Sequence, residues 1–153
     1  MLVAEGFATA ATLHEASGHT VAYAFSANNL GKTGKALRKT CPRARLLFCA
    51  DDDYLTEGNP GCDQAAKACA ELEDSAWVAP DFSDEGGADR RGGKKLTDFN
   101  DLASHSDFGR EGVQRAADVL ERRGLHPAVG GRGGGGGRFR HEGRRRFKVE
   151  GGG

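Results

Sequence analysis

Four short apolar runs that alternate with stretches of helical character limit most strongly what this chain can fold into. Each run has only three to six residues, and together they cover residues 1–4, 21–25, 45–50 and 77–79. The stretches of helical character between and after them cover residues 9–16, 30–40, 63–73 and 110–123. Short apolar runs suit strands that are buried on both faces, and their alternation with helices is typical of β-α-β units. The pattern therefore predicts an α/β fold in which a compact parallel sheet of about four strands is flanked by helices.

Charge and glycine are unevenly distributed along the chain, which divides it into two parts. Residues 130–153 hold seven basic and two acidic residues, a net charge of +5, whereas residues 1–129 hold 15 and 20, a net charge of −5. The last 24 residues also contain 11 of the 24 glycines and no sustained apolar pattern. Burial cannot offset the entropy of ordering such a segment. We therefore expect a folded domain over residues 1–125 and a disordered Gly/Arg-rich tail over residues 126–153.

Several protein classes are excluded by composition. No apolar run approaches the roughly 18 residues of a membrane span, and the N-terminus lacks the basic and apolar regions of a signal peptide. The cysteines form no CxxC pair, which disfavours a structural zinc site or a disulfide framework, and they stand at Cys41, Cys49, Cys62 and Cys69. Cys49 and Cys69 have the surroundings of small core residues. We expect a cytoplasmic protein with no membrane partner.

Carboxylates follow two of the predicted strands at the point where each strand ends. Glu5 comes directly after the first apolar run, and Asp51-Asp52-Asp53 come directly after the third. The carboxyl ends of parallel strands lie at the same edge of a sheet, where α/β proteins gather their chemistry. In extended backbone Asp51 and Asp53 point the same way, because side chains alternate with period two. We therefore expect Glu5, Asp51 and Asp53 to converge, although a solvated turn is the alternative interpretation of three consecutive aspartates.

Converging carboxylates repel one another unless a divalent cation neutralises them. Hard oxygen ligands without histidine or cysteine favour Mg²⁺ or Mn²⁺ over zinc, and Mg²⁺ in such sites takes part of its shell from substrate phosphates. The chemistry indicated is phosphoryl or nucleotidyl transfer. A later acidic motif, residues 97–102, allows two interpretations that are compatible: Asp98 as a helix N-cap, or Asp98 as a further ligand.

These motifs, in this order and at this spacing, resemble the Toprim domain, in the form found in DNA primases of plasmids and phages. The resemblance covers roughly residues 1–122, and it is carried by Val3-Ala4-Glu5-Gly6-Phe7-Ala8-Thr9-Ala10, Asn29-Leu30, Ala50-Asp51-Asp52-Asp53, Asn59-Pro60-Gly61 and Asp98-Phe99-Asn100-Asp101-Leu102. It implies that Glu5, Asp51 and Asp53 bind Mg²⁺ and carry catalysis, with Asp98 and Asp101 on the same metal-binding rim. Several such primases have another acid four residues after the glutamate, where this chain has Thr9.

The function that the resemblance implies is a Mg²⁺-dependent DNA primase-type nucleotidyltransferase that makes RNA primers in plasmid or phage replication. Its partners would be a single-stranded DNA template and nucleotide triphosphates, with a replicative helicase or a zinc-binding primase module as further candidates. Neither an upstream zinc module nor a basic subdomain is visible, so we expect a truncated or free-standing Toprim unit. The alternatives are a Toprim-type nuclease that cleaves DNA strands, or a catalytically silent nucleic-acid-binding fragment that works with a helicase or zinc module.

The basic tail offers a separate candidate site for nucleic acid. Arginine-rich glycine segments with interspersed aromatic residues, here Phe139 and Phe147, bind single strands through phosphate attraction and base stacking. The candidate contacts are Arg138, Arg140, Arg144, Arg145 and Arg146. The alternative is a low-complexity extension with no selected role.

Overall fold

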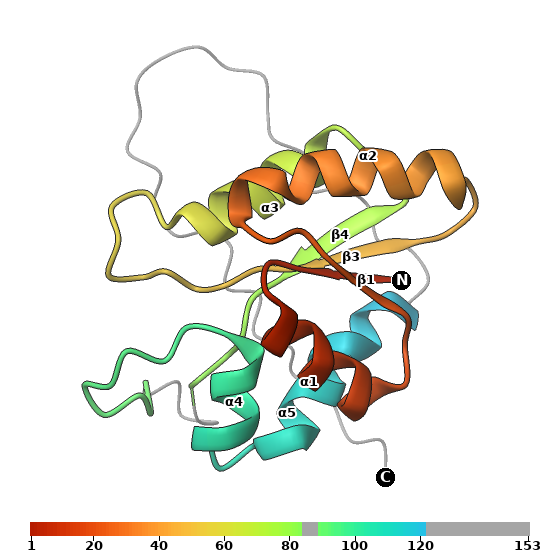
Figure 1. The fold of residues 1–153 in the computed structure, drawn as a ribbon. Coiled ribbons are helices and arrows are strands. Elements are labelled where there is room, and N and C mark those ends of the chain that lie inside the picture. Colours follow the sequence, from red (N-terminus) through yellow and green to blue (C-terminus); the bar gives the residue numbers. More distant parts are fainter. Residues whose placement is uncertain (84–88, 122–153) are drawn as a thin grey trace, which may run out of the picture.

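Strands and helices alternate along the chain, as the apolar runs predicted. The structure, a computed structural model, describes residues 1–83 and 89–121. Its strands are β1 (Leu2–Ala4), β2 (Val21–Tyr23), β3 (Leu46–Cys49) and β4 (Ser75–Val78). Its helices are α1 (Phe7–Ser17), α2 (Leu30–Thr40), α3 (Pro60–Ala70), α4 (Phe99–His105) and α5 (Gly109–Ala117), with 3₁₀ turns at Ala27–Asn29 and Asp118–Glu121. Figure 1 shows the sheet between two helical layers.

The four strands form one sheet in the order β2-β1-β3-β4, and every neighbouring pair is parallel. Strand β1 lies between β2 and β3, with Ala4 opposite both Tyr23 and Cys49. The predicted α/β class and the parallel four-stranded sheet are thus confirmed. Because all strands run the same way, the residues that follow β1 and β3 leave the sheet at one edge.

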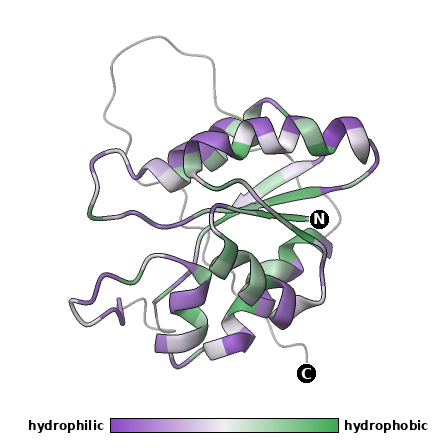
Figure 2. Ribbon diagram, in the orientation of Figure 1, coloured by the Kyte–Doolittle hydropathy of each residue, from purple (hydrophilic) through white to green (hydrophobic). Residues whose placement is uncertain are grey.

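The two central strands of the sheet, β1 and β3, are buried on both faces, which explains why they are apolar throughout. One face packs against α1, α4 and α5 through the strand residues Leu2, Ala4, Leu47 and Cys49. The other face packs against α2 and α3 through Val3, Leu46, Phe48 and Ala50. Figure 2 shows the central strands in the green of hydrophobic residues, with purple on the outer sides of the helices. The alternation of side chains along each strand therefore divides the core into two layers.

Two helices begin earlier than the sequence predicted. Helix α1 begins at Phe7 rather than at residue 9, and α3 begins at Pro60 rather than at about residue 63. Proline suits the first helical position, since its fixed φ is already helical and its missing N–H is not needed there. The last helix, expected over residues 110–123, is α-helical only to Ala117 and then tightens into a 3₁₀ turn that ends at Glu121.

Cys49 and Cys69 are buried in the core, as expected, and all four cysteines are free. Across residues 1–83 and 89–121 no helix has both the length and the apolar character needed to cross a membrane. The predicted domain end at residue 125 and the Gly/Arg-rich tail lie outside the described residues, and so do its candidate contacts Arg138, Arg140, Arg144, Arg145 and Arg146.

Candidate functional site

Glu5 and Asp51 meet at the carboxyl edge of the sheet. Each follows the end of one of two paired parallel strands, β1 and β3. Oε1 of Glu5 accepts a hydrogen bond from the backbone N–H of Asp51, at 3.1 Å, and Glu5 is only 8% exposed. The first two predicted site residues, 46 positions apart in the chain, are therefore in direct contact.

Helix α3 closes over this contact at Gly61. A Cβ atom on Gly61 would lie 2.3 Å from the backbone oxygen of Asp51 and 2.7 Å from Oε1 of Glu5. No side chain fits in that space, so the first turn of α3 can approach the two acids only because residue 61 is a glycine. The sequence indicated a turn at Asn59-Pro60-Gly61, but it held no sign that the glycine lies against the Glu5 carboxylate and the backbone of Asp51.

Asp98 is fixed from two sides. Its Oδ1 accepts a hydrogen bond from the backbone N–H of Asp101 at 2.7 Å, so it is the N-cap of α4, as one of the two interpretations predicted. Its Oδ2 accepts a hydrogen bond from the hydroxyl of Thr9 in α1, at 2.9 Å. Thr9, which stands where several primases have an acid, is 2% exposed and orients the Asp98 carboxylate.

Asp101 also takes part in the start of α4. Its Oδ2 accepts a hydrogen bond from the backbone N–H of Thr97 at 2.8 Å, and its Oδ1 lies 4.0 Å from Nδ1 of His105. The Asp98 carboxylate thus accepts from the backbone N–H of Asp101, and the Asp101 carboxylate accepts from the backbone N–H of Thr97, the residue before Asp98. This reciprocal arrangement is similar to a capping box. One oxygen of Asp101 is used by the helix start.

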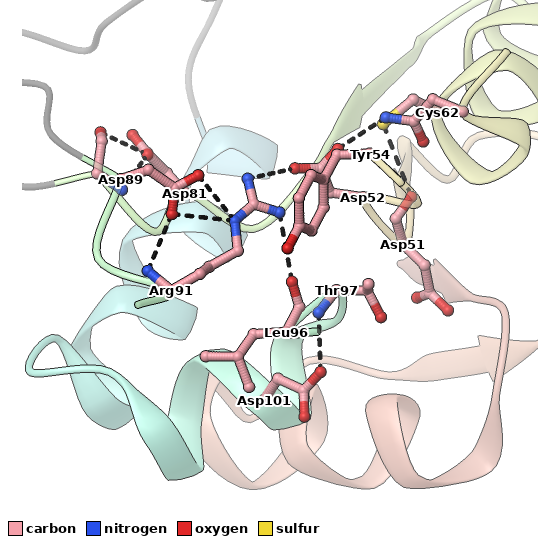
Figure 3. A network of polar contacts seen from close by, with 12 residues as sticks. Asp51, Asp52, Tyr54, Cys62, Asp81, Asp89, Arg91, Leu96, Thr97 and Asp101 are labelled. Carbon is pink, nitrogen blue, oxygen red and sulfur yellow. Dashed lines mark hydrogen bonds and ion pairs between the residues drawn. The ribbon is translucent and has the colours of Figure 1, made fainter. Parts of the chain in front are cut away.

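The three consecutive aspartates do not share one role. Asp52 forms an ion pair with Arg91, with 3.0 Å between Oδ2 and Nη2, and its Oδ1 accepts a hydrogen bond from Nδ2 of Asn59 at 2.7 Å. Figure 3 shows Asp52 directed toward Arg91 and the Asp51 carboxylate directed away from it. Asp53 is half-buried, and its backbone carbonyl accepts a hydrogen bond from the N–H of Thr56. Sequence reasoning missed Arg91, because nothing in the polar connector around it marks a buried cation.

The pKa values of Asp51 and Glu5 are raised by burial and by neighbouring acids. Burial and then the charge of Glu5, followed by those of Asp98, Asp53 and Asp101, raise the pKa of Asp51 to about 8. The pKa of Glu5 is also raised, by burial first and then by Asp53 and Asp98, against the hydrogen bond from Asp51. All four of the other predicted acids therefore act electrostatically on Asp51 at this edge. Negative charge gathered in this way favours a proton or a cation.

The residues fit a hard divalent cation in an open site. Oδ1 of Asp51 is buried and has no hydrogen-bond partner. As the side chains stand, no group of three or more His, Cys, Asp or Glu residues in the described part of the chain is arranged to hold a metal ion. Mg²⁺ sites commonly use one or two carboxylates and complete the shell with water and substrate phosphate, so a closed cage is not required. Glu5, Asp51 and Asp53, with Asp98 beside them, offer oxygen ligands of the kind that Mg²⁺ and Mn²⁺ bind.

Comparison with known proteins identifies relatives of this chain. The chain is 28% identical to a DNA primase TraC of Escherichia coli, in an alignment that covers 75% of this chain and 16% of the relative. It is 34% identical to another DNA primase TraC of Escherichia coli, over 54% of this chain and 6% of that relative. The chain thus spans only a small part of the length of these relatives. No solved structure matches it at a significant level.

A family model described as the Toprim domain matches residues 1–107, a range that contains all five acids of the carboxyl edge. The match confirms the resemblance predicted from the motifs. This chain belongs to the Toprim domain family.

Proposed function

We propose that this chain is the metal-dependent catalytic module of a DNA primase-type nucleotidyltransferase, which joins nucleotides into an RNA primer on a DNA template. The observation that carries the proposal is the contact between Glu5 and Asp51, in a group of acids that raises the pKa of Asp51 to about 8. A site with this much unbalanced negative charge is suited to a divalent cation and an incoming triphosphate. The similarity to DNA primase TraC supports primer synthesis as the reaction.

In this proposal Glu5, Asp51 and Asp53 are the catalytic residues and the main Mg²⁺ or Mn²⁺ ligands. Asp98 and Asp101 complete the rim, Asp98 as a ligand held by Thr9 and Asp101 chiefly through its charge, since one of its oxygens caps α4. When bound, the metal neutralises charge on the transferred phosphate and lowers the pKa of the attacking hydroxyl.

The contacts of Glu5 prepare it for orientation and proton transfer. One oxygen is held by the Asp51 N–H, which leaves the other to face ligand or substrate. A carboxylate oxygen at this place can accept the proton of the primer 3′-hydroxyl during in-line attack. Gly61 lets α3 pack directly against the Glu5 carboxylate and the backbone of Asp51.

The proposed substrates are nucleotide triphosphates and a single-stranded DNA template. We propose a replicative helicase or a zinc-binding primase module as further partners, because the chain corresponds to 16% of a TraC primase. The tail arginines, Arg138, Arg140, Arg144, Arg145 and Arg146, are proposed contacts for single-stranded nucleic acid, and they lie outside the described residues.

Primer synthesis on single-stranded DNA with labelled ribonucleotides and Mg²⁺ tests the proposal. We expect Asp51→Asn to reduce synthesis by at least about 100-fold, since oxygen ligands and charge are removed from the metal. Asp107→Asn is the matched control, because Asp107 is an exposed aspartate that pairs with Arg90. Equal activity of wild type and Asp51→Asn would refute the assignment. Metal-dependent nicking of supercoiled DNA without primer synthesis would instead identify a strand-cleaving Toprim enzyme.

A further inference from the structure

We propose that Arg91 is a positioning residue that sets the spacing between the two acid-bearing segments of the site, residues 51–53 after β3 and residues 98–101 at the start of α4. The inference rests on the proposed function, since it concerns the geometry of the same metal site. Arg91 itself contacts neither Asp51 nor Asp98 in any hydrogen bond or ion pair of the structure; it acts through Asp52 and the chain before α4.

Arg91 is a buried cation, and each of its three guanidinium nitrogens donates a hydrogen bond. The residue is 6% exposed. Its Nη2 donates to Oδ2 of Asp52 at 3.0 Å, its Nε donates to Oδ2 of Asp89 at 3.0 Å, and its Nη1 donates to the backbone oxygen of Leu96 at 3.3 Å. One guanidinium thereby joins the loop after β3, at Asp52, to two points of its own connector, Asp89 and Leu96 (Figure 3).

The flat shape of the guanidinium is also used. Its central carbon lies 3.8 Å from the ring centre of Tyr54 and 5.0 Å from that of Phe82. The Tyr54 hydroxyl donates to the backbone oxygen of Lys94 at 3.1 Å, which ties the post-β3 loop again to the chain before α4. Lysine has a point charge and no planar fork, so it can reproduce neither the stacking nor the three-way hydrogen bonding.

The Arg91–Asp52 pair lies next to a direct backbone link between the two acid-bearing segments. The N–H of Asp52 donates to the backbone oxygen of Thr97 at 2.7 Å. The neighbours of these two residues in sequence are Asp51 and Asp98, so the link sets how far apart the two candidate ligands can lie. Asp52 is 18% exposed at its side chain, and without Arg91 it would add an unpaired, largely buried charge to an edge that is already acidic.

Two consequences follow for the candidate site. Asp52 is a structural anchor, which reserves Asp51 and Asp53 for the metal. The positive charge of Arg91 is balanced by its ion pairs with Asp52 and Asp89. Arg91 therefore positions the site but does not take the place of the metal ion. Residues that orient metal ligands from outside typically change metal affinity by about 10–100-fold when they are altered.

Mn²⁺ binding to the full chain, measured by calorimetry and by the EPR signal of free Mn²⁺, tests the inference without relying on activity. We expect Arg91→Lys to weaken Mn²⁺ affinity at least about tenfold while the near-UV CD spectrum stays that of a folded protein. Arg90→Ala is the matched control: Arg90 is the adjacent arginine, half-exposed and paired with Asp107. Its Mn²⁺ affinity should stay within about twofold of wild type, since it touches neither acid-bearing segment.

Asp52→Asn breaks the same link from the other side and serves if Arg91→Lys does not fold. It should also weaken Mn²⁺ binding at least about tenfold, and adding Arg91→Lys to it should cost little more, because both changes remove one interaction. In primer synthesis the variants should require a higher Mg²⁺ concentration, and excess Mg²⁺ should restore the rate of synthesis.

The outcomes separate the two proposals. If wild type binds Mn²⁺, Asp51→Asn does not, and both Arg91→Lys and Asp52→Asn bind as wild type does, the role of Arg91 is refuted and the metal site stands. If wild type and Asp51→Asn bind Mn²⁺ equally weakly, the metal site itself is refuted, and the positioning role falls with it.

Discussion

Replacing Asp51 by asparagine should make the metal-free protein more stable while it abolishes metal binding. Asp51 has a buried oxygen without a hydrogen-bond partner, next to Glu5 and within the influence of three other acids. Its pKa is raised from 3.8 to about 8. An acid whose pKa is raised by folding binds its proton more tightly in the folded protein than in the unfolded chain. The wild-type protein in EDTA should therefore lose stability as the pH rises from about 4 toward about 8.

The size of the effect follows from the same shift. One pKa unit corresponds to about 1.4 kcal/mol, so the whole shift of Asp51 would amount to roughly 6 kcal/mol if Asp51 acted alone. The shift is shared with the neighbouring carboxylates, and Asp51 keeps partial contact with water, which reduces the expected gain from Asp51→Asn to about 1–3 kcal/mol at pH 8. The midpoint of thermal unfolding should rise by roughly 3–10 °C. Below the unfolded-chain pKa of 3.8 the gain should vanish, because the wild-type carboxyl is then protonated in both the folded and the unfolded state.

Thermal unfolding followed by circular dichroism at several pH values, with EDTA or with Mg²⁺, measures this directly. Mg²⁺ at 100 times its dissociation constant should stabilise wild type by about 2.7 kcal/mol and leave Asp51→Asn unchanged. A variant that is equally or less stable than wild type at pH 8 in EDTA would contradict the reasoning. So would a stability difference that does not vary with pH, which is what a solvated turn at residues 51–53 would produce.

Three further predictions concern the supports of the site and the tail. Gly61→Ala should lower the free energy of unfolding in urea by about 1–3 kcal/mol, because its Cβ would meet the backbone oxygen of Asp51, which cannot move aside. Gly31→Ala is the control: its Cβ would meet nothing within 4 Å, so it should be neutral or stabilising. Thr9→Val should lower Mn²⁺ affinity several-fold in calorimetry, because it removes the hydrogen bond that holds the Asp98 carboxylate. Thr12→Val, which removes a hydrogen bond to the amide oxygen of Asn100, should not lower it. Equal affinities of the two variants would count against a role for Asp98 in metal binding. Deleting residues 130–153 should weaken binding to single-stranded DNA and flatten its salt dependence by roughly three to five units of slope, and an unchanged slope would show that the tail does not contact phosphates.

Much of the fold could be predicted from local sequence pattern. The short, uniformly apolar run at residues 46–50 favours a strand buried on both faces, and helical stretches between such runs favour parallel crossovers. Once the sheet is parallel, β1 and β3 end at the same edge, and because these two strands are neighbours in the sheet Glu5 and Asp51 come together. The N-cap role of Asp98 is equally local, since it depends on the first turn of one helix.

Only the tertiary packing decided which of the acids has a structural role and which is left free to bind a cation. Asp51, Asp52 and Asp53 are the same residue type in consecutive positions, and their sequence contains nothing that sets Asp52 apart. Its partner, Arg91, lies 39 positions away in a connector without periodicity, and the approach of Gly61 to Glu5 depends on how α3 packs against the sheet. Sequence pattern determined which elements form and which edge collects charge, because those depend on neighbouring residues and strand direction. Which carboxylate is neutralised and which is left for a cation depends on contacts between distant segments, and these exist only in the folded protein.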